Sequence, residues 1–249
     1  MKVHFIGIGG IGLSALARFL NFDGHEVSGS DMKSSLITKA LEDEGIKVSC
    51  PQSASNIQDD FDLVIYSAAV TDENPELIEA RLKQIRTLSR KEALPIILGD
   101  KKNYCVAGAH GKSTTTAMLA SILESSALIG AISKDFGSNF RYVNDLIAFE
   151  ADESDASFLL SNPFCAIVTN AEPEHMEYYH YDYDKFYGSY ERFLSLAKKR
   201  VVNAEDKDIA KLKIKDAVYF YPSKDIKNLC YTLKNGEPCT KFDLKDLGT

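Results

Sequence analysis

The sequence predicts an α/β protein of two successive domains, each built on a parallel sheet with helices on its faces. Three observations predict this fold class. A glycine-rich turn at residues 7–12 follows a short apolar run near the amino terminus. A glycine-rich loop at residues 108–113, which ends in lysine and serine, follows a second apolar run. Short apolar runs also alternate with amphipathic stretches, the pattern of βα units. We expect a Rossmann-like domain over residues 1–99 and a P-loop-type α/β ATPase domain over residues 100–249, divided at the polar residues 99–102.

Composition and charge argue against several classes of protein. The 249 residues carry a formal net charge of −7 without a basic block, so nucleic acid is not an expected partner. The five cysteines are widely spaced and odd in number, which favours free thiols in a reducing compartment. The amino-terminal apolar run resembles a secretory signal, but four glycines interrupt it, and no run of 18 apolar residues occurs. We expect a cytoplasmic protein with no membrane partner.

The first glycine turn predicts a diphosphate site. A strand expected at residues 3–8 leads into Gly7-Ile8-Gly9-Gly10-Ile11-Gly12, which opens a helix and lets a diphosphate approach the backbone. The next strand, at residues 25–30, ends at Asp31, 19 residues after Gly12. An acid at that distance binds the ribose in dinucleotide enzymes, which makes NAD one candidate ligand. The same turn serves any diphosphate ligand, and Asp31 is equally suited to capping the following helix.

The rest of the first domain continues the βα pattern. We expect helices at residues 34–44 and 90–98, a further helix that starts at Asn74-Pro75 with Pro75 in its first turn, and strands at residues 47–50, 63–67 and 85–88. The strand at residues 63–67 ends in Ser67-Ala68, and small residues there leave room for a ligand at the carboxyl edge of the sheet.

The second glycine loop predicts a triphosphate site. A strand at residues 103–107, the loop Gly108–Ser113 and a helix at residues 113–125 aim backbone N–H groups and a helix dipole at one spot. Lys112 adds a positive charge, and the Ser113 hydroxyl suits Mg²⁺. The loop is shorter than the standard Walker sequence, which would place a glycine where Val106 stands. The alternative is a glycine turn capped by Ser113 beside a solvated lysine.

Polar side chains follow two later strands. A strand at residues 145–150 runs into the acidic residues 150–155, where a Mg²⁺ ligand is expected; a solvated, helix-capping turn is the alternative. A strand at residues 164–169 leads to His175, 25 residues after Glu150, so two neighbouring strands are expected to bring both to one edge. Imidazole is a common metal ligand, although less usual for Mg²⁺, and a solvated histidine is the alternative.

The remaining segments are expected to complete this domain. Residues 128–131, 200–203 and 217–221 are expected strands, residues 136–141 a polar loop, and the last stretch carries no motif. Helical spacing places Phe186, Tyr190, Phe193 and Leu194 in the core.

Four motifs in one order resemble the Mur ligase family. They are the glycine turn with its Asp31, the loop Gly108–Thr116, the acidic segment 150–155, and Thr169-Asn170-Ala171-Glu172-Pro173-Glu174-His175-Met176. The resemblance implies three domains: the first holds a UDP-sugar, the second binds ATP, and the third supplies further contacts to ATP and to the amino acid. At 249 residues the chain is expected to be a fragment that lacks the third. Ala109 and Ser113 replace two threonines of the family pattern; Ser113 keeps the hydroxyl and Ala109 loses it.

The resemblance also implies roles for individual residues. UDP-sugar contacts would come from Gly9, Gly10, Ile11, Gly12, Ser30, Asp31, Ser67 and Ala68, with Asn139 and Arg141 approaching the substrate. ATP would be bound by Gly108, Ala109, His110, Gly111, Lys112, Ser113 and Thr114. Lys112, Glu150 and His175 would be catalytic, and Ser113, Glu150 and His175 would bind Mg²⁺, with Glu150 preferred to Glu153.

The implied reaction belongs to peptidoglycan synthesis. ATP would phosphorylate the lactyl carboxylate of UDP-N-acetylmuramate, and the amine of L-alanine would attack the acyl phosphate. Three alternatives remain: a sister ligase that adds a peptide to the same sugar nucleotide, an NAD-dependent oxidoreductase, and a non-catalytic UDP-sugar-binding module. The oxidoreductase alternative does not explain why a second phosphate-binding loop is present at residues 108–113.

Overall fold

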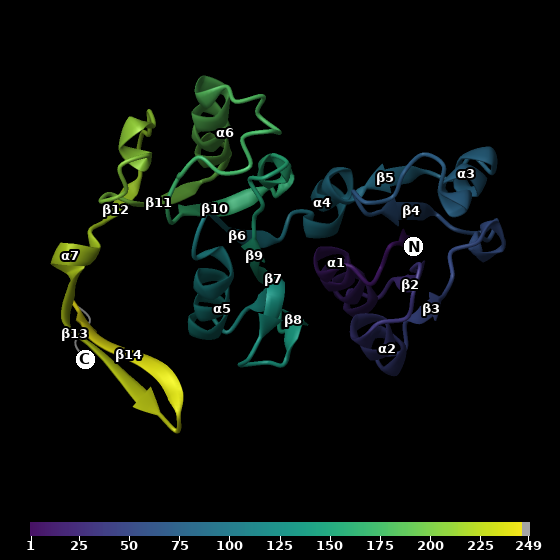
Figure 1. Cartoon of the computed structure of the whole chain (residues 1–249), viewed down its shortest axis with the longest axis horizontal. Coiled ribbons are helices and arrows are strands. Elements are labelled where there is room, and N and C mark those ends of the chain that lie inside the picture. Colours follow the sequence, from purple (N-terminus) through teal and green to yellow (C-terminus); the bar gives the residue numbers. More distant parts are fainter. Residues whose placement is uncertain (246–249) are drawn as a thin grey trace.

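A computed structural model describes residues 1–245 and shows two α/β lobes followed by a β-hairpin (Figure 1). The first lobe contains a five-stranded sheet and the second a seven-stranded sheet. The last strand of the first sheet ends at Ser89, and the first strand of the second begins at Lys102. The two lobes share one packed interface, because α1 contacts β7 and β8 of the second sheet.

The first sheet is fully parallel, in the order β3-β2-β1-β4-β5. Its elements are β1 (Lys2–Ile6), α1 (Ile11–Phe22), β2 (Glu26–Ser30), α2 (Leu36–Asp43), β3 (Lys47–Ser49), η1 (Ala54–Asn56), β4 (Leu63–Tyr66), α3 (Pro75–Leu82), β5 (Thr87–Ser89) and α4 (Arg90–Leu98). Ile6 pairs with Ser30 on one side and with Tyr66 on the other. The glycine turn, Asp31 and Ser67 therefore meet at one carboxyl edge, as the order of the motifs predicts.

The second sheet has the order β12-β11-β10-β6-β9-β7-β8 and is parallel except for the β7–β8 pair. Its elements are β6 (Lys102–Ala107), α5 (Lys112–Ile122), β7 (Ser126–Ser133), β8 (Ser138–Arg141), β9 (Leu146–Glu150), η2 (Ser157–Leu160), β10 (Pro163–Val168), α6 (Tyr183–Leu196), β11 (Lys199–Asn203), η3 (Ile209–Lys211) and β12 (Val218–Phe220). The predicted α/β fold class is confirmed, with the phosphate loop following the central strand β6.

Two expectations about this sheet are wrong. Residues 138–141 form strand β8 instead of a polar loop, because Phe140 is buried and pairs with Leu128 of β7. The strands that precede Glu150 and His175 are not neighbours either, since β6 lies between β9 and β10. Insertion of the phosphate-loop strand between them places β9 and β10 two strand spacings apart instead of one.

The core of the second lobe follows the predicted helical spacing. Phe186, Tyr190, Phe193 and Leu194 are all buried on the inner face of α6. Phe158 of η2 stacks on Phe193 and meets Tyr190 edge to face. In the described part of the chain, no helix has the length and apolar character needed to cross a bilayer.

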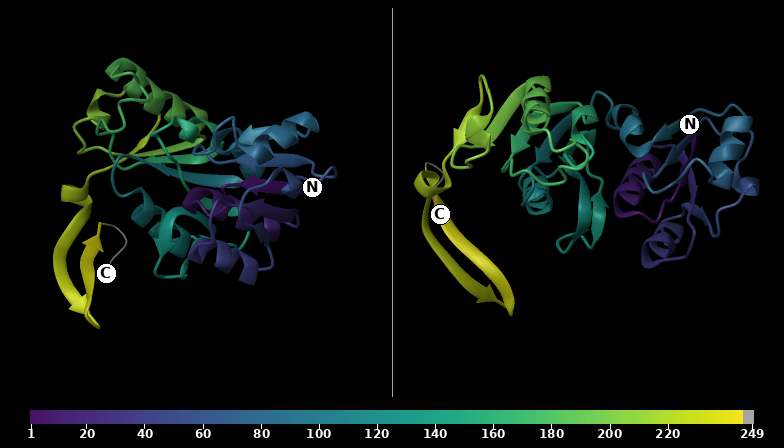
Figure 2. Two further views of the ribbon diagram at one scale, coloured as in Figure 1. Left: turned by 45° about the vertical axis from the view of Figure 1, so that its right-hand side comes forward. Right: turned by 45° about the horizontal axis from the view of Figure 1, so that its top comes forward.

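The carboxyl-terminal segment, for which the sequence showed no motif, forms an antiparallel hairpin after the short helix α7 (Pro222–Asp225). Its strands are β13 (Ile226–Lys234) and β14 (Glu237–Leu244). Figure 2 shows in both views that this hairpin projects away from the two sheets. Tyr231 and Leu233 on it are 77% and 69% exposed.

Candidate phosphate and sugar-nucleotide sites

The loop between β6 and α5 forms a phosphate cradle. Gly108 and Gly111 adopt φ values of 140° and 81°, which only glycine adopts readily. A Cβ on Gly108 would lie 2.9 Å from the carbonyl oxygen of Asn170, so this position also needs the absence of a side chain. No side chain caps the first turn of α5. Its free N–H groups and the positive end of the helix dipole therefore remain available for an anion.

Lys112, at the start of α5, turns back over the loop. Its Nζ donates to the carbonyl oxygen of Gly108 at 2.6 Å and to Oε1 of Glu153 at 2.9 Å. The Glu153 side chain is only 2% exposed, and its Oε2 has no hydrogen-bond partner. Burial raises the pKa of Glu153 above its usual value, although Lys112 acts in the opposite direction. Sequence reasoning missed this ion pair, and the alternative of a solvated lysine is wrong.

Ser113 and Glu150 lie together beside the loop. The Ser113 hydroxyl donates to Oε1 of Glu150 at 3.0 Å, and the N–H of Gly130 on β7 donates to Oε2 at 2.8 Å. Hydroxyl and carboxylate oxygens are the ligands that Mg²⁺ prefers, so this pair fits the ion. Within residues 1–245, no three His, Cys, Asp or Glu side chains converge to form a metal site. Phosphate oxygens and water would supply the other ligands, as is usual for Mg²⁺.

His175 is not part of this cluster in the structure. The residue is exposed and has a left-handed backbone with φ 52°. Among the described residues, its ring makes no hydrogen bond or ion pair with Ser113 or Glu150.

The segment after β10 forms the other wall of the phosphate loop. Asn170 accepts a hydrogen bond from the N–H of His110 at 3.1 Å and donates one to the carbonyl oxygen of His110 at 2.8 Å. The Thr169 hydroxyl donates to the same carbonyl oxygen at 2.8 Å. These contacts hold the loop in place.

The predicted binding residues Ala109 and Thr114 lie on the accessible side of the loop, where Ala109 is half-buried and Thr114 is exposed.

A cavity of about 900 Å³ lies at the carboxyl edge of the first sheet. Of the predicted UDP-sugar residues, it is lined by Gly9, Gly10, Asp31 and Ser67. Asp31 accepts a hydrogen bond from the N–H of Gly9 at 2.9 Å and so fixes the glycine turn. It does not cap the next helix, because Ser35 and Thr38 form the capping box of α2. The sequence did not indicate the opposite wall, which includes Gln52 and Asn74.

Other predicted UDP-sugar residues lie outside the cavity lining. Ser30 is fully buried and donates to Oε2 of Glu76. Gly12 faces Arg90, whose Nη1 would lie 2.9 Å from an added Cβ. Ile11 and Ala68 are adjacent to lining residues but are not among them.

Asn139 and Arg141 are not directed at the cavity, contrary to the expectation. The Asn139 amide is fully buried and bonds the carbonyl oxygen of Ile11, the Ser14 hydroxyl at 3.0 Å and Nη1 of Arg18 at 2.7 Å. It therefore ties β8 to α1 across the two lobes. Arg141 donates to the carbonyl oxygens of Ala120 and Ser125 and so satisfies the carboxyl end of α5.

The two candidate sites approach each other at the interface of the lobes. A narrow cavity there is lined by Gly12 of the glycine turn and by Gly130 and Glu150 of the second lobe. Arg90 spans this interface, with its Nη2 3.3 Å from Asp152 and 3.8 Å from Asp155. Burial favours a higher pKa for Asp152, but hydrogen bonds from Ser154 and the charges of Arg90 and Lys112 hold it below its usual value. The acidic segment of the second lobe thus pairs with Arg90 of the first lobe.

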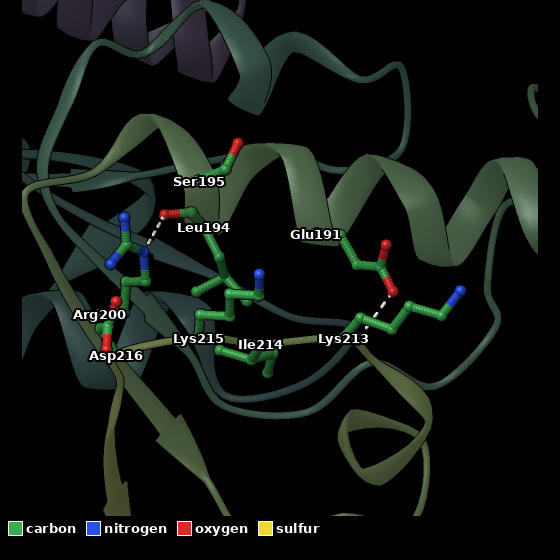
Figure 3. A pocket seen from close by; sticks show the side chains of 8 residues that line it. All are labelled: Glu191, Leu194, Ser195, Arg200, Lys213, Ile214, Lys215 and Asp216. Carbon is green, nitrogen blue, oxygen red and sulfur yellow. Dashed lines mark hydrogen bonds between the residues drawn. The ribbon is translucent and has the colours of Figure 1, made fainter.

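A third cavity, of about 280 Å³, lies elsewhere on the second lobe (Figure 3). It lies between the last turn of α6 and residues 213–216, and Arg200 at the start of β11 lines it. Arg200 donates to the carbonyl oxygen of Leu194 at 2.7 Å, and the N–H of Lys213 donates to Glu191 at 2.7 Å. None of the predicted site residues lines it, and its lining residues Arg200 and Asp216 lie near the starts of β11 and β12, whereas the phosphate loop follows the end of β6.

Comparison with known proteins gives one family. Residues 2–102 match the Mur ligase family, catalytic domain, and residues 106–242 match the Mur ligase middle domain. The chain is 57% identical over 248 residues to a UDP-N-acetylmuramate--L-alanine ligase of Campylobacter curvus, covering 99% of this chain and 57% of the relative. It is 50% identical to the enzyme of that name from Helicobacter pylori, covering 99% and 55%. The chain thus spans a little over half the length of these relatives.

Solved structures agree with the sequence comparison. A crystal structure of the UDP-N-acetylmuramate-alanine ligase of Thermotoga maritima matches with a TM-score of 0.78 and 33% identity, over 88% of this chain and 53% of that chain. A murein peptide ligase of Psychrobacter arcticus has the same fold, with a TM-score of 0.74 at 22% identity over 100% of this chain and 62% of that chain. The motifs, the fold and these matches together show that the chain belongs to the Mur ligase family.

Proposed function

We propose that this chain is the sugar-nucleotide-binding and ATP-binding part of an ATP-dependent ligase that joins L-alanine to UDP-N-acetylmuramate in peptidoglycan synthesis. One observation carries the proposal. A cavity of about 900 Å³ lined by a glycine turn lies in one lobe, a phosphate cradle with Lys112 lies in the other, and the two lobes share an interface. A ligase that couples a sugar nucleotide to ATP needs both sites in one molecule. The printed name of the relatives from Campylobacter curvus and Helicobacter pylori supports the choice of substrates.

The residues of the cradle suit phosphoryl transfer. In the proposed reaction, the γ-phosphoryl group passes to the lactyl carboxylate, and the amine of L-alanine then displaces phosphate from the acyl phosphate. Lys112 and the N-terminus of α5 would stabilise the charge on the transferring group, and the loop from Gly108 to Thr114 would bind the triphosphate. Mg²⁺, when bound, would neutralise phosphate charge at Ser113 and Glu150, with His175 as a proposed further ligand.

The residues of the cavity suit the sugar nucleotide. The N–H groups of the glycine turn would bind its diphosphate, as in other turns of this kind. One carboxylate oxygen of Asp31 accepts a hydrogen bond from the N–H of Gly9, and the other accepts one from the N–H of Met32. Asp31 therefore orders the turn in addition to facing the ligand. An NAD-dependent oxidoreductase explains this site but not Lys112, Ser113 and Glu150. ATP and sugar nucleotides are cytoplasmic metabolites, so we propose the cytoplasm as the location.

Calorimetric titration tests the first half of the proposal. The chain is titrated with UDP-N-acetylmuramate in the presence of Mg²⁺, and NADH is the control ligand. Saturable binding of the sugar nucleotide without binding of NADH is expected. Binding of NADH alone would remove the ligase assignment in favour of an oxidoreductase.

A second measurement tests the amino acid. A ligase that contains this chain is assayed for phosphate release with L-alanine and, separately, with a tripeptide as the amine. Turnover with L-alanine is expected. Turnover with the tripeptide alone would show a sister ligase.

A further inference from the structure

A buried carboxylate lies behind the sugar-nucleotide cavity and does not line it. Glu76, the second residue of α3, is 0% exposed. Its Oε1 accepts hydrogen bonds from Nδ2 of Asn56 at 2.6 Å and from the N–H of Ser53 at 3.1 Å. Its Oε2 accepts from the Ser30 hydroxyl and lies 3.4 Å from Nε2 of His4. Both oxygens of the carboxylate are therefore fully used.

The partners of Glu76 hold it ionised. Burial by itself would raise the pKa of Glu76, but the hydrogen bonds from His4, Ser30 and Asn56 outweigh burial and lower it. The carboxylate also lies in the first turn of α3, where Asn74 caps the helix and the dipole favours a negative charge. A buried charge of this kind costs desolvation energy, and apolar residues of similar volume often stabilise a fold equally well. A fixed geometry is therefore a better explanation of Glu76 than stability alone.

Each segment that Glu76 contacts continues into a wall of the cavity. Ser30 is followed by Asp31, which lines the cavity on the β2 side. Ser53 and Asn56 belong to the segment that begins with Pro51 and Gln52, two residues of the opposite wall. The helix that carries Glu76 starts at Pro75, and both Pro75 and Asn74 line the cavity.

A hydrogen bond joins two of these walls at the cavity itself. Nδ2 of Asn74 donates to Oε1 of Gln52 at 2.8 Å. Glu76 thus links three walls from behind, and the Asn74–Gln52 pair links two of them at the surface. No other carboxylate among residues 1–245 accepts hydrogen bonds from both the end of β2 and the segment 51–56.

We propose that Glu76 is a positioning residue that holds the end of β2, the segment 51–56 and the start of α3 in the geometry that binds the sugar nucleotide. The inference rests on the proposed function, because it assigns the cavity to that ligand. Glu76 does not touch the ligand. It acts through Asp31, Gln52 and Asn74, which do face the cavity.

Three proteins test the inference: the unchanged chain, Glu76→Gln and Ile85→Val. Glu76→Gln keeps the shape of the side chain but removes its charge and replaces one acceptor by a donor. Ile85→Val trims the small apolar cluster beside α3 and destabilises the same lobe, and Ile85 itself does not line the cavity. Calorimetry measures the Kd of each protein for UDP-N-acetylmuramate and for ATP with Mg²⁺ at a temperature where all three are folded.

Glu76→Gln is expected to raise the Kd for UDP-N-acetylmuramate about tenfold, since hydrogen bonds to a charged group are lost, and to leave the Kd for ATP unchanged. Ile85→Val is expected to leave both values unchanged. An unchanged Kd for the sugar nucleotide in Glu76→Gln overturns the inference, and so does an equal loss in both variants, which would show an effect of stability.

Amide hydrogen exchange separates this inference from the proposed function. Residues 53–56 are expected to exchange faster in Glu76→Gln than in the unchanged chain or in Ile85→Val, because their anchor is weakened. If the unchanged chain does not bind UDP-N-acetylmuramate, the proposed function fails, and exchange alone then decides the present inference. Unchanged protection of residues 53–56 in Glu76→Gln overturns it.

Discussion

Nζ of Lys112 lies 2.9 Å from Oε1 of Glu153, and the other oxygen of that buried carboxylate has no hydrogen-bond partner. The lysine that is proposed to bind the phosphates is therefore paired with a buried carboxylate of its own lobe when no nucleotide is bound. A triphosphate would compete with Glu153 for Lys112. The pair links the stability of the second lobe to its activity, because neither partner is suited to being buried alone.

Replacement of Lys112 is expected to cost both activity and stability. Lys112→Met should lower ATP turnover of a ligase that contains this chain by about a thousandfold or more, since a charge that stabilises the transferring group is lost. It should also lower the free energy of unfolding by about 3 kcal/mol, because Glu153 remains buried without its partner. Turnover assays and urea unfolding measure the two effects.

The double variant Lys112→Met with Glu153→Leu separates these effects. Its free energy of unfolding should return to within about 1 kcal/mol of the unchanged chain, because a buried ion pair and an apolar pair are often similar in stability. Its ATP turnover should stay lost. Recovery of turnover in the double variant would show that Lys112 serves only to neutralise Glu153.

Asn139 is expected to stabilise the folded chain by hydrogen bonding across the interface of the two lobes. Asn139→Ala removes hydrogen bonds to Ser14 and Arg18 and to the Ile11 carbonyl, all within a buried site. The free energy of unfolding should fall by about 2–4 kcal/mol, because these groups lose their partner without gaining water. Asn21→Ala on α1 is the control, and a loss no larger than in that variant would show that Asn139 does not tie the lobes together.

The stability that Glu76 provides is expected to depend on pH in one direction. Its pKa is lower in the folded chain than in the unfolded chain, so the folded state favours the ionised form. The difference in unfolding free energy between the unchanged chain and Glu76→Gln should be full above about pH 5 and shrink as the pH falls through the folded pKa. Urea unfolding from pH 7 to pH 3 measures it. A difference that grows on acidification would mean that the folded state favours the protonated carboxyl.

The sequence predicted those parts of the sites that depend on local geometry. Glycines after an apolar run fix the turn at Gly9, and the order of strand, loop and helix fixes Lys112 and Ser113. The meeting of Ser113 with Glu150 also followed, because strands of a parallel sheet end at one edge.

The parts that the sequence did not predict depend on contacts between distant segments. Nothing near Asn139 in the sequence marks it as an interface residue, because its partners lie on α1 of the other lobe. Glu150 ends β9 and Glu153 follows three residues later, so the sequence alone gave no reason to pair Glu153 with Lys112. Strand order is also not local, which is why the expected adjacency of β9 and β10 was wrong.

Gly9 is expected to be essential to the sugar-nucleotide site for a steric reason. A Cβ at this position would lie 2.8 Å from Oδ2 of Asp31 and 3.1 Å from Cγ2 of Thr38, so Gly9→Ala must displace the carboxylate that fixes the turn. The Kd for UDP-N-acetylmuramate should rise at least about tenfold, which corresponds to the loss of one such interaction, while the Kd for ATP with Mg²⁺ stays unchanged. Gly188→Ala in α6 is the matched control, because an added Cβ there meets nothing within 4 Å. Equal sugar-nucleotide binding by Gly9→Ala and Gly188→Ala would show that the ligand does not use this turn.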